Sequence, residues 1–220
     1  MLYAYDPNDQ LKHNIHINDW VVRHHKADGC CKICHESVFV KGLESQKKAH
    51  FSHYPNSSCP LITSHHKPYE HLKNIPRDAT LIPLRKEWLK NNLYEVYYKI
   101  KKEFPNLCFT WKDLELSVKS ANDINVWALK DMPMDYIPYV LLVSVSKYPK
   151  TKIRKNEYFY VLETLQKDTS YSSVFWNDNK LSKKIIWEVK ISTSINTVIE
   201  YDINLETAIP PYVKKIIDLL

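Results

Sequence analysis

Five side chains of the types that bind zinc lie close together near the start of this 220-residue chain. They are Cys31, Cys34, His50, His53 and Cys59. Two cysteines separated by two residues place both thiolates on one tight turn, which suits tetrahedral zinc. We expect a cytoplasmic protein without a membrane segment, and in a reducing compartment cysteines clustered with histidines are typical of metal ligands rather than disulfides. The spacing therefore predicts a bound Zn²⁺ with a structural role.

The choice among these ligands depends on local geometry. Cys30 offers a competing register, but a spacing of three residues to Cys34 fits a zinc knuckle less well. If residues 49–52 form a strand, His50 and His53 point to opposite faces, so His50 is only an alternative ligand. Four protein ligands leave no open position, which favours a structural site over a catalytic one. The predicted ligands are Cys31, Cys34, His53 and Cys59.

The first part of the chain, residues 1–66, reads as a small zinc-stapled β module. Short strands are expected at residues 3–5 and 11–17, separated by a turn. Residues 37–40 and 49–52 also have strand character and flank Gly42, which predicts a β-hairpin next to the cysteine pair.

The second part, residues 67–220, is predicted to be a larger α+β domain, so the whole chain belongs to the α+β class. Apolar side chains recur at helical spacing over residues 84–104, and Pro105 stops the run. Residues 110–121 fit either a helix or a strand. The remaining predicted elements are strands at 136–145, 157–165, 174–176 and 185–191, and a helix at 212–220 behind two prolines.

The motif of the first part resembles a known family. Cys31-Lys-Ile-Cys34, Val38-Phe-Val-Lys-Gly42 and His50-Phe-Ser-His53 are similar to the N-terminal zinc-finger-like module of the competence protein CoiA-like family. The resemblance covers residues 1 to about 66 and implies a zinc-binding module of proteins tied to DNA uptake, DNA processing or mobile elements. Full-length members continue with a nuclease-like domain entered through an ESxEHxxxK-type segment. Here only Glu70 and His71 stand at comparable positions.

Positive charge is unevenly distributed along the chain. The net charge is +6, and residues 65–105 alone hold 9 basic and 5 acidic residues. Residues 147–155 contain no acidic residue, and such a stretch is a candidate for contact with the phosphates of nucleic acid. A solvated turn explains the same pattern equally well. The five candidate nucleic-acid-binding residues are Lys147, Lys150, Lys152, Arg154 and Lys155.

A catalytic interpretation rests on three other residues. Glu188 and Lys190 are two apart on a predicted strand, and Asp178 precedes them by ten positions. In restriction-type nucleases, acidic side chains hold Mg²⁺ and a lysine on the same strand face helps to activate water. A strand with a solvated Glu and Lys face explains the pattern as simply. With two glycines in the chain, a glycine-rich phosphate loop is excluded.

Three hypotheses follow from these patterns. The leading one is a zinc-stabilised, non-catalytic accessory or adaptor protein that engages nucleic acid, DNA rather than RNA, or a nucleic-acid-processing complex of DNA uptake, defence or mobile elements. The second is a divalent-metal-dependent endonuclease that uses Asp178, Glu188 and Lys190 with Mg²⁺. The third is a structural subunit that binds a protein partner. None of the three requires a membrane.

Overall fold

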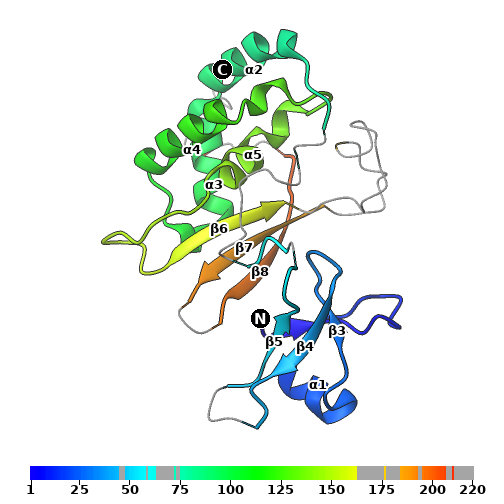
Figure 1. Cartoon of the computed structure of the whole chain (residues 1–220). Helices are drawn as coiled ribbons and strands as arrows, with labels where there is room; N and C mark the ends of the chain where they lie inside the picture. Colours follow the sequence, from blue (N-terminus) through cyan, green and yellow to red (C-terminus); the bar gives the residue numbers. More distant parts are fainter. Residues whose placement is uncertain are drawn as a thin grey trace. The chain divides into compact units, whose positions relative to one another are not determined.

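The computed structural model describes residues 1–44, 48–57, 59–62, 72, 75–162, 176, 184–192, 195–206 and 210. It divides into two compact units (Figure 1). Unit 1 comprises Met1–Lys67 and Val189–Ile199, and unit 2 comprises Pro68–Glu188 and Glu200–Leu220. Helices and antiparallel strands both occur, so the predicted α+β class is confirmed. No helix in the described part of the chain has the length and apolar character needed to cross a bilayer.

Unit 1 is built mainly from short strands. β1 (Tyr3–Ala4) pairs antiparallel with β2 (Ile15–His16). A second sheet contains β3 (Gly29–Cys30), β4 (Ser37–Lys41) and β5 (His50–His53) in that order. The predicted hairpin is present, because β4 and β5 pair antiparallel with Val38 opposite His53. The strand predicted over residues 11–17 is confined to the two residues of β2.

One helix of unit 1 was not predicted from the sequence. α1 (Ile17–His24) follows β2 directly, and the ring of His16 accepts a hydrogen bond from the backbone N–H of Asn18 at the start of the helix. Ile17 and Trp20 are buried. Gly29 lies against this helix, because a Cβ at that position would come within 3.0 Å of the Trp20 ring. A side chain at position 29 would require the Trp20 ring or Ala4 to shift by a few tenths of an ångström.

Unit 2 has a mainly helical core with a sheet packed against it. α5 (Ile137–Ser144) contacts α3 (Leu93–Glu103), α4 (Trp111–Asp123) and β6 (Glu157–Leu162). β6 belongs to a three-stranded sheet in the order β6-β7-β8. The other elements are η2 (Ala79–Leu81), α2 (Ile82–Asn91), η3 (Pro105–Leu107), η4 (Val126–Ala128), η5 (Met134–Tyr136), β7 (Ile185–Ile191) and β8 (Thr197–Asp202). Residues 189–191 of β7 and 197–199 of β8 belong to unit 1.

The single helix predicted over residues 84–104 is in fact two helices. α2 ends at Asn91 and α3 begins at Leu93, with Asn92 between them at φ −116° and ψ 19°. The Asn92 side chain donates a hydrogen bond to the carbonyl of Trp88 at 2.7 Å. Asparagine competes in this way with the backbone bonds of a helix, and the apolar periodicity does not report the break.

The prediction of a strand over residues 136–145 is wrong, because this segment is helical: it forms the end of η5 and then α5. Every residue of Ile137–Ser144 is buried, so no polar face remains to reveal the helical period. Pro138 lies in the first turn, where the missing N–H costs no helical hydrogen bond. Full burial on all sides therefore made a short helix look like a buried strand.

The remaining predictions divide into two groups. Residues 110–121, which fitted a helix or a strand, form α4, whose Thr110 and Asp113 make a capping box. The strands predicted at 157–165 and 185–191 correspond to β6 and β7. Residues 163–165, most of the strand predicted at 174–176 and the helix predicted at 212–220 lie outside the described residues.

Candidate functional site

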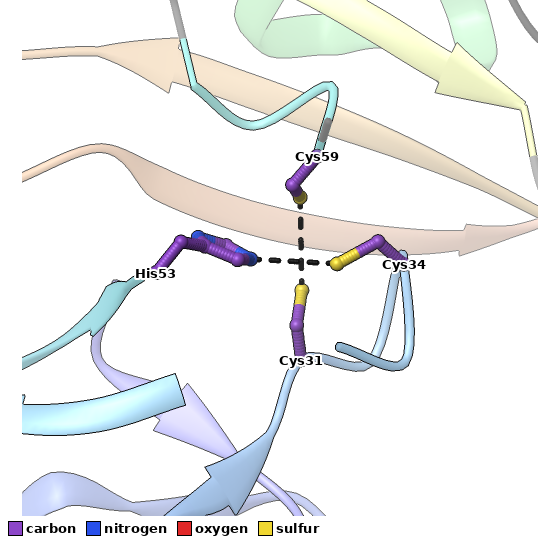
Figure 2. A group of neighbouring side chains, drawn as sticks. All are labelled: Cys31, Cys34, His53 and Cys59. Atoms are coloured by element: carbon purple, nitrogen blue, oxygen red, sulfur yellow. Dashed lines mark hydrogen bonds between the residues drawn. The ribbon is translucent and has the colours of Figure 1, made fainter. Parts of the chain in front are cut away.

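Four side chains of unit 1 converge on one point (Figure 2). One ligand atom from each of Cys31, Cys34, His53 and Cys59 lies within 4.8 Å of every other. The Cys31 and Cys59 sulfurs are 3.9 Å apart, and the Cys34 sulfur is 3.4 Å from Nε2 of His53. In Figure 2 the lines joining these two pairs cross, as opposite edges of a tetrahedron do when viewed along their common axis.

These separations match the edges of a tetrahedral metal site. With metal–sulfur bonds of about 2.3 Å and a metal–nitrogen bond of about 2.0–2.1 Å, tetrahedral angles place two sulfurs about 3.8 Å apart and a sulfur and a nitrogen about 3.6 Å apart. The two separations given above differ from these values by a few tenths of an ångström. The cluster can therefore hold a metal ion, and three thiols with one imidazole are a donor set compatible with zinc.

Local structure positions each ligand. Cys31 follows β3 directly, and its sulfur accepts a hydrogen bond from the backbone N–H of Ile33 at 3.4 Å, as expected for a tight knuckle. The turn closes through a bond from the N–H of His35 to the carbonyl of Cys31 at 2.8 Å. His53 ends β5. The N–H of Cys59 is held by the hydroxyl of Ser57 at 3.2 Å.

The electrostatics of the three thiols favour a cation between them. Hydrogen bonds from Cys34 and Cys59 lower the pKa of Cys31 well below its usual range, and the hydrogen bonds to Cys31 raise the pKa of Cys34 and of Cys59. Three thiolates at this distance would repel one another. A divalent cation at the centre offsets that repulsion and allows all three thiols to ionise.

Two residues that competed for the site lie outside the cluster. His50 is opposite Lys41 at the other end of β5 from His53, and its Nδ1 is 2.9 Å from the carbonyl oxygen of Lys48. Cys30 lies in β3, where its backbone forms a pair of hydrogen bonds with Tyr5. Side chains alternate between the two faces of a strand, so residues three apart point to opposite faces. Because His53 faces the three thiols, His50 cannot reach the cluster.

Of the three residues of the nuclease hypothesis, the structure describes Glu188 and Lys190. Glu188 is fully buried, and its two carboxylate oxygens accept hydrogen bonds from the Tyr160 hydroxyl at 2.7 Å and from the Asn106 amide at 3.0 Å. Burial raises the pKa of Glu188. Lys190 is half-buried, and Asp178 lies outside the described residues. Within the described ranges, no second cluster of three or more metal-ligating side chains occurs.

The predicted phosphate-binding stretch, residues 147–155, is called the basic loop below. Arg154 is among the five candidate phosphate-binding residues predicted from the sequence, but its side chain is fully buried and cannot contact a phosphate at the surface. Its guanidinium forms an ion pair with Asp113 at 2.5 Å and donates hydrogen bonds to the carbonyls of Leu107 at 2.6 Å and Pro149 at 2.9 Å. Arg154 therefore anchors the loop to the start of α4.

The lysines of the basic loop are exposed. Lys147 pairs with Glu157 at 3.3 Å. Among the described residues, no carboxylate lies within ion-pair distance of Lys150, Lys152 or Lys155.

The sequence alone does not identify Asp113 as the partner of Arg154. The Thr110-x-x-Asp113 capping signal was readable locally, but a contact across 41 positions carries no signal in the spacing.

The chain was compared with protein families, curated proteins and solved structures, and none of the three comparisons found a match.

Proposed function

We propose that this protein is a zinc-stabilised accessory protein that binds nucleic acid, DNA in the first place, without a reaction of its own. In this proposal zinc occupies the cluster of Cys31, Cys34, His53 and Cys59. Three thiolates and one imidazole complete a tetrahedral shell and leave no position for water or substrate, which is the arrangement of structural rather than catalytic zinc.

The single observation that carries nucleic-acid binding is the anchored basic loop. The buried ion pair between Arg154 and Asp113 holds the loop at its base, while Lys150, Lys152 and Lys155 stand exposed within six positions. Lysines held close together on a fixed loop attract phosphates and release their condensed counterions. The resemblance of the Cys31–His53 motif to a module of DNA-handling proteins points in the same direction.

The surroundings of Glu188 support an accessory role over the endonuclease alternative. A nuclease of the restriction type needs an ionised carboxylate that is open to Mg²⁺ and water. Here both oxygens of Glu188 are engaged by Tyr160 and Asn106 in a buried environment that raises the pKa of the carboxyl group. These contacts favour a structural role for Glu188.

The test is a salt series with a variant in which Lys150, Lys152 and Lys155 are all replaced by Gln. Binding of the full chain to a DNA duplex should weaken, and the slope of log K against log salt should become shallower by about 0.9 for each phosphate contact that is lost. The matched control replaces Lys26, Lys41 and Lys48, three exposed lysines of unit 1, and removes the same charge. The proposal fails if the parent binds no nucleic acid at low salt, or if both triple variants reduce the slope equally.

A further inference from the structure

An exposed aromatic stack lies on the helices of unit 2. Tyr97 of α3 and Trp111, the first residue of α4, are stacked with ring centroids 4.1 Å apart and an interplanar angle of 8°. Tyr94, one turn before Tyr97, lies 6.3 Å from Trp111 with a tilt of 38°. Trp111 is 48% exposed and Tyr94 is 45% exposed. This group of Tyr94, Tyr97 and Trp111 is called the aromatic platform below.

The exposure of Trp111 is unusual within this chain. Four of the six tryptophans are at most 2% exposed, and a fifth, Trp88, is half-buried. The four buried ones are Trp20, Trp127, Trp176 and Trp187. A large aromatic ring contributes most to stability when it is removed from water. Tyr97 covers one face of the Trp111 indole, and nearly half of the residue remains accessible to solvent. The platform can therefore accept another flat ring without any rearrangement of the core.

Two lysines and Glu95, which follows Tyr94 in α3, accompany the aromatic platform, and this positive excess suits an anionic ligand. Lys101 lies over the Tyr97 ring at 5.6 Å from its centroid, and Lys112 is exposed next to Trp111. Of the acidic residues in the first turns of α4, Asp113 is buried in its pair with Arg154 and Glu115 pairs with Lys119 at 2.6 Å. The pair between Asp113 and Arg154 also places the basic loop at the same end of α4 as Trp111.

We propose that the aromatic platform stacks unpaired bases, so that the preferred ligand is a single-stranded segment of nucleic acid. This inference rests on the proposed function and names its ligand class. Bases in a duplex are already stacked on one another, whereas each base of a single strand offers a free π-face to an aromatic side chain. In this arrangement an unpaired base stacks on the free face of Trp111, whose other face is covered by Tyr97. Lys101 and Lys112 then contact the phosphates of the strand.

The experiment measures how strongly the full-length Trp111→Ala variant and the parent bind a single strand and a duplex. The probes are a labelled oligothymidylate of about 20 nucleotides, longer than the about 4–16 nucleotides of a typical single-strand site, and a duplex of equal length. Fluorescence anisotropy should show a loss of affinity of about 5-fold to about 150-fold for the single strand, the range known for one stacked base. Duplex binding should change less than about twofold, because phosphate contacts remain. The matched control is Tyr3→Ala, which removes a 49% exposed ring from unit 1.

The possible outcomes separate this inference from the function on which it rests. If Trp111→Ala changes neither probe, or weakens both equally, while the triple lysine variant weakens both, the aromatic platform is excluded and nucleic-acid binding stands. If the parent binds neither probe at low salt, both proposals fail. An equal loss in Tyr3→Ala also overturns the inference. Trp111→Phe, which keeps a smaller ring on the same stack, should show an intermediate loss, and it keeps the test decisive if the alanine variant does not fold.

Discussion

At the scale of single residues, His50 and His53 are chemically identical groups that the strand separates. His53 faces the three thiols, whereas Nδ1 of His50 lies 2.9 Å from the carbonyl oxygen of Lys48. We expect His53→Ala to weaken zinc binding by more than about 100-fold, since even the loss of a hydrogen-bonding partner of a ligand costs about 10–100-fold. His50→Ala should retain its zinc. Competition with a chromogenic chelator measures both affinities, and the reverse order would contradict the ligand assignment.

Glu188 permits a second prediction at this scale, because a glutamine can take its place between Tyr160 and Asn106. Burial raises the pKa of Glu188, so the native state binds more protons than the unfolded chain above the usual Glu pKa of about 4.3. The carboxyl group therefore lowers the free energy of unfolding as pH rises from about 4 to its raised pKa. Glu188→Gln, which does not titrate, should gain stability relative to the parent at pH 7 but not at pH 4. Each unit by which the pKa is raised corresponds to about 1.4 kcal/mol.

Urea denaturation at the two pH values checks this prediction. The matched control is Glu115→Gln, because Glu115 is exposed and its hydrogen bond with Lys119 lowers the pKa of its carboxyl group. Its pH dependence should therefore have the opposite sign. An advantage of Glu188→Gln that is equal at pH 4 and pH 7 would show that the carboxyl group titrates normally.

At the scale of elements, Arg154 joins a loop to a helix. Its guanidinium pairs with Asp113, which also accepts hydrogen bonds from the N–H and hydroxyl of Thr110 in the capping box of α4. Removal of one partner of a buried pair leaves the other charge uncompensated, at a cost of about 3–5 kcal/mol. We expect Arg154→Ala to lower the free energy of unfolding by this amount. Lys152→Ala, two residues away and exposed, should change it by less than about 0.5 kcal/mol, and chemical denaturation compares the two.

This prediction also bears on the basic loop. If Arg154→Ala costs no more free energy of unfolding than Lys152→Ala, the ion pair does not hold the loop, and the three lysines are not fixed as a group.

At the scale of the whole molecule, the two units differ in what stabilises them. The large apolar core, which includes α5 and β6, lies entirely within unit 2. Unit 1 has short strands and a small set of buried apolar residues around Trp20 and Phe51. In a small module of this kind, the free energy of metal binding is free energy of folding. We expect a strong chelator to unfold unit 1 and leave the helices of unit 2 intact.

Hydrogen exchange with and without the chelator measures this difference. Amides of β4 and β5 should lose protection when zinc is removed, while amides of α3 and α5 keep theirs. Equal loss in both sets would mean that the metal stabilises the entire chain, and no loss in either would mean that unit 1 folds without it.

The sequence by itself determined the features that depend on neighbours in the chain. Cys31 and Cys34 share a tight turn because two residues separate them, and the alternation of a strand means that only one of His50 and His53 can face them. The hairpin of β4 and β5 follows from two β-rich segments on either side of Gly42. Each of these inferences spans fewer than about 30 residues and depends on backbone geometry alone.

The tertiary structure alone decided the features that depend on what packs around a segment. Residues 137–144 form a helix whose period is invisible because all of its faces are buried. The composition of the basic loop predicts an exposed Arg154, but Arg154 is buried in a pair with Asp113, 41 positions away. The alternation of β7 is equally compatible with an exposed Glu188, but Tyr160 and Asn106 enclose its carboxylate. Periodicity reports burial only where another face meets water, and the spacing of residues does not record which distant side chain will neutralise a charge.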